Sequence, residues 1–158
     1  MNIVACSIVS TRRDYCNALL LAGVSEKNLH KLQLVRNTLA HVVTGTRRRD
    51  HITPVLAELH WLPVRARITF KIATHVSKIK LTRQPSYLAD LIMNYKPLRK
   101  LRSASRLLLP EPVFVAETAR RFFRFSAART WNGYQTLNQL GTFRNEFKTH
   151  LSRLSYCS

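Results

Sequence analysis

Residues 50–71 read DHITPVLAELHWLPVRARITFK, and two prolines in this stretch mark two predicted helix starts. Thr53 can cap a short helix that has Pro54 at its first position, where the missing proline N–H leaves no hydrogen bond unmade. Pro63 then ends that piece and sets the first turn of a second helix over 64–81. We therefore expect the stretch to form a packed corner between two helices.

The predicted helix over 64–81 has two faces of different character. Apolar residues recur at helical spacing along one face, and basic residues recur along the other. Because β-branched residues lower helix propensity, a strand over 68–73 is the competing prediction, but length and period favour the helix. The apolar face consists of Val64, Ile68, Ile72 and Ile79, with His75 among them, and the basic stripe consists of Arg67, Lys71, Thr74 and Lys78.

Helical spacing also dominates the first fifty residues. A short helix is expected to end at Gly23, and Ser25 caps a longer helix that has Glu26 in its first turn, where the helix dipole favours an anion. Gly45 ends this longer helix. Its apolar stripe consists of Leu29, Leu32, Val35, Leu39 and Val42, and the loop after it carries Arg47, Arg48 and Arg49.

Beyond residue 84 we expect a short helix, a long connection and two further helices. Pro85 starts the short helix, and residues 94–117 form the connection because they hold three prolines and five basic residues. A helix is expected near 118–131, and the alternative is a small β-hairpin that pairs RLLLPEPVFV (106–115) with RRFFRF (120–125). The last helix has Thr142 as its cap, Phe143, Phe147, Leu151 and Leu154 on one face, and Arg144, Lys148 and Arg153 left for solvent or a partner.

These elements predict a mainly α fold, a single irregular helical domain with the small β-hairpin as an option in its C-terminal third. Three regions follow from the pattern. Residues 1–93 form a helical region that contains the 50–71 stretch, residues 94–117 form a proline-rich and basic connection, and residues 118–158 form a C-terminal helical segment. Trp61 and Trp131 are expected to anchor the core.

The charge of the chain is its most unusual property. Its 158 residues include 26 Lys and Arg but only 8 Asp and Glu, which gives a formal net charge of +18 and a pI near 11.1. Such an imbalance favours a polyanionic partner, with nucleic acid first and an acidic membrane surface second. No apolar run approaches the length that spans a bilayer and no signal peptide is recognisable, so we expect no membrane partner.

The cysteines and histidines predict an intracellular protein without a structural metal. Cys6, Cys16 and Cys157 form no CxxC pair, and their odd number does not fit a disulfide framework. A reducing compartment, the nucleus or the cytoplasm, is therefore expected. The six histidines and three cysteines never fall at the spacing of a zinc site.

Residue patterns for catalysis are missing. The acidic residues are scattered singly, whereas two-metal phosphoryl transfer needs carboxylates that converge on the metal ions. The four glycines are isolated, so no loop cradles a phosphate. Cys16 is better explained as a packed thiol than as a nucleophile, and His51 and His60 as hydrogen-bonding residues than as general bases. We expect no enzyme, no cofactor and no small-molecule substrate.

Three basic groups remain as candidate nucleic-acid contacts, because arginine matches phosphate oxygens and aromatic rings can stack on unpaired bases. For the loop triplet, solvated charge and phosphate contact are equally supported. For the helical stripe, phosphate contact is favoured since no acidic residue is nearby in sequence. Phenylalanines between the third group's arginines fit a core better than a stacking platform. The groups are Arg47, Arg48 and Arg49; Arg67, Lys71 and Lys78; and Arg120, Arg121 and Arg124, interleaved with Phe122, Phe123 and Phe125.

Several blocks of the chain, in this order, resemble the C-terminal region of the polyprotein of non-LTR (LINE-type, jockey-like) retrotransposons. The order and spacing hold from about Ile3 to Leu154, and the central block is the most specific. The blocks are DYCNALL, LVRNTLAHVVTGTRRRDHITPVLAELHWLPVRARITFKI, QPSYLADLI, LRSASRLLLPEP, FSAARTWN and FKTHL.

The resemblance implies an origin in an RNA-directed DNA polymerase that copies its own RNA at a nicked chromosomal target. The polymerase motif of that family contains paired aspartates and precedes the segment that this chain resembles. Because this sequence has no such pair, no catalytic residue of the family carries over. The resemblance implies instead a region after the polymerase, whose basic helical surface holds template RNA or target DNA.

The chain departs from the family pattern at a few positions. Arg129 stands where a proline is usual, Arg13 stands where a leucine is expected, and GYQTL replaces the usual Leu-Pro after Trp-Asn. Each departure predicts weaker packing. We therefore expect a remnant of the retrotransposon polymerase that lacks its active site and binds RNA or DNA without sequence specificity. The alternatives are a protein-interaction module or a decayed, non-functional open reading frame.

Overall fold

The computed structural model describes residues 23–93, 108–113, 122–134 and 143–156, together with residues 7 and 11. Within these ranges the chain is mainly helical and contains no strand, as the mainly α prediction requires. The helices are α3 (Glu26–Thr44), α4 (Ile52–Glu58), α5 (Val64–Thr82), α6 (Ser86–Leu91), α7 (Phe123–Gly133) and α8 (Phe143–Tyr156). The predicted helix before Gly23 and most of the 94–117 connection lie outside the described residues.

The 50–71 stretch forms the predicted corner between α4 and α5. Helix α4 begins at Ile52, so His51 takes the cap position expected for Thr53, and Pro54 lies in the first turn. The helix ends with His60 in a left-handed conformation at φ 54°. The backbone N–H groups of His60 and Trp61 donate to the carbonyls of Ala57 and Leu56, at 3.0 and 2.9 Å. These two bonds close the helix end in a Schellman motif.

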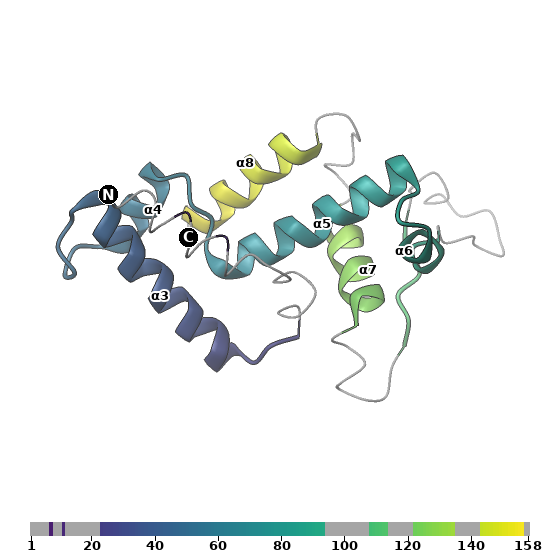
Figure 1. Cartoon of the computed structure of the whole chain (residues 1–158), viewed down its shortest axis with the longest axis horizontal. Coiled ribbons are helices and arrows are strands. Elements are labelled where there is room, and N and C mark those ends of the chain that lie inside the picture. Colours follow the sequence, from purple (N-terminus) through teal and green to yellow (C-terminus); the bar gives the residue numbers. More distant parts are fainter. Residues whose placement is uncertain are drawn as a thin grey trace.

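Helix α5 is the central element of the fold. In Figure 1 it crosses the middle of the molecule, with α8 above it, α7 below it, α3 and α4 at one end and α6 at the other. Pro63 occupies its N-terminal cap position, as predicted. The strand alternative for 68–73 is wrong because all of these residues are helical.

The buried face of α5 is wider than the predicted apolar stripe. All four apolar residues of that stripe are buried, and Ala73, Val76 and Ser77 are buried beside them. Helices α7 and α8 pack on α5, and Ala73 and Val76 lie in one buried cluster with Trp131 and Phe147. The placement of His75 on the apolar face is wrong, because its side chain lies outside the buried core.

The main core joins α5 to the two C-terminal helices. Trp131 of α7 and Phe147 of α8 are the two largest apolar side chains in it, with exposed fractions of 1% and 0%. The ring of Phe147 stacks on Phe70 with centroids 6.2 Å apart, and Tyr134 meets it edge-on at 4.7 Å. The prediction that Trp131 anchors the core is confirmed.

A segment of the connection is attached to α7 by one side chain. The Asn132 amide donates from Nδ2 to the carbonyl of Leu109, and its Oδ1 accepts from the Leu109 backbone N–H, both at 2.9 Å. Leu109 is buried in the main core. The amide thus satisfies both backbone polar groups of a buried residue in an irregular segment.

The β-hairpin alternative is not supported by the described residues. Residues 108–113 of its first half have no regular secondary structure, and Phe123 and Phe125 of its second half lie in α7. The predicted helix is present, but the described helix starts at Phe123 rather than near residue 118. Burial of Ala127, Ala128 and Trp131 against α5 requires helical spacing, and this packing decides between the two patterns.

Helix α3 buries a different face from the one predicted. It starts and ends as expected, and Gly45 follows it in a left-handed conformation. The Ser25 hydroxyl makes no cap hydrogen bond, and the Ser25 carbonyl accepts from Asn28 and Leu29 instead. In the predicted stripe, Leu29, Leu32 and Leu39 are partly buried but Val35 and Val42 are exposed; Arg36 and Ala40 are the buried residues of the helix.

Trp61 is held in place by a cation–π contact with the buried side chain of Arg36. Its side chain is only 1% exposed, and its guanidinium lies over the Trp61 ring, 5.3 Å from the centroid. From α8, the Tyr156 hydroxyl donates to the carbonyls of Trp61 and Leu56. Trp61 is therefore partly buried between helices α3, α4 and α8, where a cation–π contact supplements apolar packing.

Candidate nucleic-acid interface

A concave site lies where α5 faces α8, beside the turn that ends α4. The pocket has a volume of about 450 Å³. Its described lining contains three permanent cations and two imidazoles but no acidic residue. The lining residues are His60, Leu62, Arg67, Phe70, Lys71, Thr74, His75, Asn145 and Lys148, and we call this site the α5–α8 groove.

The cations of the groove are positioned by helix geometry and by the core. Arg67 and Lys71 are four residues apart on α5, which places them on the same side one turn from each other. Lys148 comes from α8, directly after the fully buried Phe147. Because Phe147 stacks on Phe70, α8 is fixed against α5 and holds Lys148 at the groove. Three cations from two helices thus converge on one pocket.

The groove combines many polar lining residues with two apolar ones. Leu62 is buried and Phe70 is partly buried. The Thr74 hydroxyl donates to the Phe70 carbonyl at 2.7 Å, so its proton is committed to the backbone.

His75 stands among the cations of α5. Burial lowers the pKa of His75 below its ordinary value of 6.5, and the charges of Lys71 and Lys78 lower it further. The imidazole is therefore mainly neutral at pH 7. Desolvation is the larger cause of this low pKa, and the positive charges of Lys71 and Lys78 add to it.

The three basic groups predicted from the sequence do not form one surface. Arg47, Arg48 and Arg49 are exposed in the loop between α3 and α4, which Figure 1 shows at the far left end of the molecule. Arg124 is exposed in the first turn of α7, on the other side of α5 from α8. Arg120 and Arg121 lie outside the described residues. Only the helical stripe contributes to the groove, through Arg67 and Lys71, and Lys78 is exposed one to two turns beyond it.

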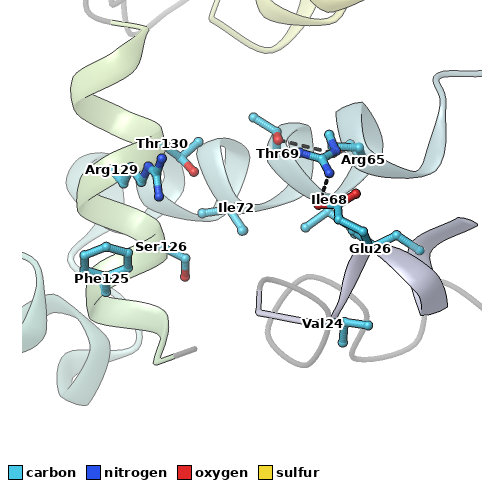
Figure 2. A pocket seen from close by; sticks show the side chains of 11 residues that line it. Val24, Glu26, Arg65, Ile68, Thr69, Ile72, Phe125, Ser126, Arg129 and Thr130 are labelled. Atoms are coloured by element: carbon cyan, nitrogen blue, oxygen red, sulfur yellow. Dashed lines mark hydrogen bonds and ion pairs between the residues drawn. The ribbon is translucent and has the colours of Figure 1, made fainter. Parts of the chain in front are cut away.

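A second pocket of about 360 Å³ lies between α5, α7 and the start of α3 (Figure 2). The Arg65 guanidinium points at Glu26 and forms an ion pair with its carboxylate. Arg129 and Thr130 extend from α7 beside α5. Because Glu26 offsets one of the two guanidinium charges, this pocket is less basic than the α5–α8 groove.

Arg129 is one of the departures that predicted weaker packing. Its side chain is exposed at the rim of the second pocket, while its neighbours Ala127, Ala128 and Trp131 face the core. The arginine therefore replaces no buried residue, and the predicted packing defect is absent at this position. Arg13 and most of the GYQTL segment lie outside the described residues.

Lys80 is a partly buried cation that contacts a core residue. Its ammonium lies 4.6 Å from the centroid of the Trp131 ring. Burial, and to a lesser degree the charge of Arg83, lowers the pKa of Lys80 to about 8. This residue is directed at the core, so it belongs to packing and not to the basic surface.

The described ranges contain neither a cluster of metal ligands nor a helix that could cross a membrane. No three His, Cys, Asp or Glu side chains in those ranges come together as a metal site would require. None of the helices in the same ranges combines the length and the apolar character needed to cross a membrane. Compared with known proteins, the chain matches no protein-family model, no curated protein and no solved structure.

Proposed function

We propose that the chain derives from the C-terminal region of a non-LTR retrotransposon RNA-directed DNA polymerase, has no polymerase active site of its own, and binds the backbone of RNA or DNA without sequence specificity. The observation that carries the binding proposal is the α5–α8 groove. It gathers Arg67, Lys71 and Lys148 with no acidic residue in its described lining. The resemblance of the sequence blocks supports the origin.

Phosphate is the ligand that best fits these side chains. Arginine offers paired donors and lysine offers a compact charge, and both groups attract the continuous negative charge of a nucleic-acid strand. The net charge of +18 adds a long-range attraction to any polyanion. Contacts of this type position a strand but do not read its bases, so the binding is sequence-independent.

The continuous core supports a folded binding module over a decayed reading frame. Helices α5, α7 and α8 bury Trp131, Phe147 and the apolar face of α5 in one cluster. The cations of the groove are thereby held on rigid elements. A preformed site loses less conformational entropy on binding than a flexible basic tail does.

The test of the proposal is the salt dependence of binding. Affinity for several RNA and DNA oligonucleotides of unrelated sequence should fall steeply between low and moderate salt, with similar slopes, because binding releases counterions. Fluorescence anisotropy titrations at four or five salt concentrations measure this. Affinity that is independent of salt, or confined to one sequence, would contradict the proposal.

The pH dependence of binding should report on His75. A bound phosphate favours the imidazolium, so it raises the pKa of His75 above that of the free protein. The complex then holds more protons than its components, and the affinity should rise as the pH falls from about 8 to about 5.5. Anisotropy titrations across this range should show a weaker rise in the His75→Asn variant. The other charged or titratable groups near His75 are His60, Arg67, Lys71, Lys78 and Lys148.

A further inference from the structure

The α5–α8 groove has a shape and a chemistry that phosphate binding alone does not require. A flat basic surface would bind a backbone equally well, whereas this site is a pocket of about 450 Å³ that Leu62 and Phe70 help to line. We propose that the groove admits one unpaired nucleotide, so that the chain prefers single-stranded RNA or DNA to a duplex. This inference rests on the proposed nucleic-acid binding and names its substrate class.

The size of the pocket separates single strands from duplexes. Its volume lies within the range of pockets that enclose small organic ligands, of which a nucleotide is one. An unpaired nucleotide can turn its base into the pocket while its phosphates stay at the rim near Arg67, Lys71 and Lys148. In a duplex the bases are paired and stacked, so only phosphates reach the rim. The pocket itself is then left without a ligand.

The pocket contains aromatic rings on which a base can stack and a polar side chain that can hydrogen-bond to a base. The rings of His75 and of the partly buried Phe70 supply ring surface, and stacking on such rings tolerates any base. Asn145 offers an amide that can donate to and accept from a base edge. The groove therefore joins three backbone-binding cations to a base-binding interior, the two requirements for binding a single strand.

The left-handed backbone of His60 indicates that a side chain is needed at this position of the groove. It stands at the left-handed position of the Schellman motif, at φ 54°, where glycine fits without strain. Its Nδ1 lies 2.9 Å from the Glu58 carbonyl, and because a carbonyl only accepts, Nδ1 carries the proton. This hydrogen bond fixes the orientation of the ring. A strained histidine with an oriented ring thus lines the groove.

This position provides a variant that separates folding from binding. His60→Gly removes the imidazole and relieves the left-handed backbone, so its Tm should be equal to or above that of the parent protein. Arg83 is a matched control because it has φ 55° at the end of α5, outside the groove. Arg83→Gly should likewise keep or raise the Tm, and it should leave the preference for single strands unchanged.

The experiment compares a labelled single strand with the blunt duplex of the same sequence, in ribo- and deoxyribonucleotide forms. We expect the double variant His60→Gly, Asn145→Ala to lose about tenfold in affinity for the single strand and less than about twofold for the duplex. The ribo and deoxyribo arms show which sugar the groove accepts. The full chain is used throughout, and thermal melts establish that each variant is folded.

The outcomes distinguish this inference from the proposed function on which it rests. Equal losses on strand and duplex, or an unchanged affinity for the single strand in a folded variant, would overturn the unpaired-nucleotide site. If the parent protein binds both forms equally with a normal salt slope, only this site is overturned. If it shows no salt-dependent binding to either form, the proposed function is overturned as well.

Discussion

Replacing Trp131 by alanine is expected to lower the free energy of unfolding by about 3–5 kcal/mol. Trp131 is the largest of the fully buried side chains, and it lies where α7 packs on α5. Its removal leaves a cavity that small neighbours such as Ala127 and Ala128 cannot fill. Lys80 would also lose the ring beneath its half-buried ammonium.

Chemical denaturation followed by circular dichroism measures this loss. Folded proteins are generally stable by only about 5–15 kcal/mol, so the Trp131→Ala variant should unfold at a much lower denaturant concentration. Phe122→Ala is the control, because Phe122 is an aromatic residue just before the same helix but is 62% exposed. Its effect should stay within about 0.5 kcal/mol. A loss below about 1 kcal/mol for Trp131→Ala would show that α7 does not pack on α5 as described.

Local sequence signals predict the corner and the central helix well. Pro63 fits a helix start but cannot continue a helix, so it marks the start of α5, whereas α4 has already ended at Glu58. The apolar period of 64–82 is long enough to exclude a strand, despite its β-branched residues. Signals of this kind act within a few residues and do not depend on the rest of the chain.

Tertiary packing decides what the sequence leaves open. The run around Phe122–Phe125 is compatible with a strand as well as with the expected helix, and the burial of the Trp131 side of α7 against α5 favours the helix. In α3, apolar spacing marks Val35 and Val42, yet the face that meets α4 and Trp61 contains Arg36. An arginine is expected outside, and its burial depends on an aromatic partner 25 positions away.

The candidate site was predicted in part. The basic stripe of α5 follows from the spacing of Arg67 and Lys71, but the groove needs a second wall. That wall is α8, whose Lys148 joins the stripe because Phe147 is anchored on Phe70. The sequence signal for Lys148 was its position directly after a core residue of α8. No signal in the sequence gives the left-handed backbone that places His60 at the rim.

Replacing the three cations of the groove by glutamine should remove most of their contribution to the salt dependence of nucleic-acid affinity. In the triple variant Arg67→Gln, Lys71→Gln, Lys148→Gln, the slope of log affinity against log salt should flatten by about 2.7 on duplex DNA and about 2.1 on a single strand. These values follow if each side chain neutralises one phosphate. At low salt the affinity should fall for all sequences alike, because phosphate contacts carry no base readout.

The most direct test of the groove as the binding site compares this triple variant with Arg47→Gln, Arg48→Gln, Arg49→Gln. Both variants lower the formal net charge of +18 by three, and both leave the buried core intact. The loop triplet precedes α4, and none of its three arginines lines the groove. We predict that the groove variant flattens the salt slope by the amounts above and the loop variant by less than half as much. An unchanged slope in the groove variant, or an equal flattening in the loop variant, would contradict binding at the α5–α8 groove.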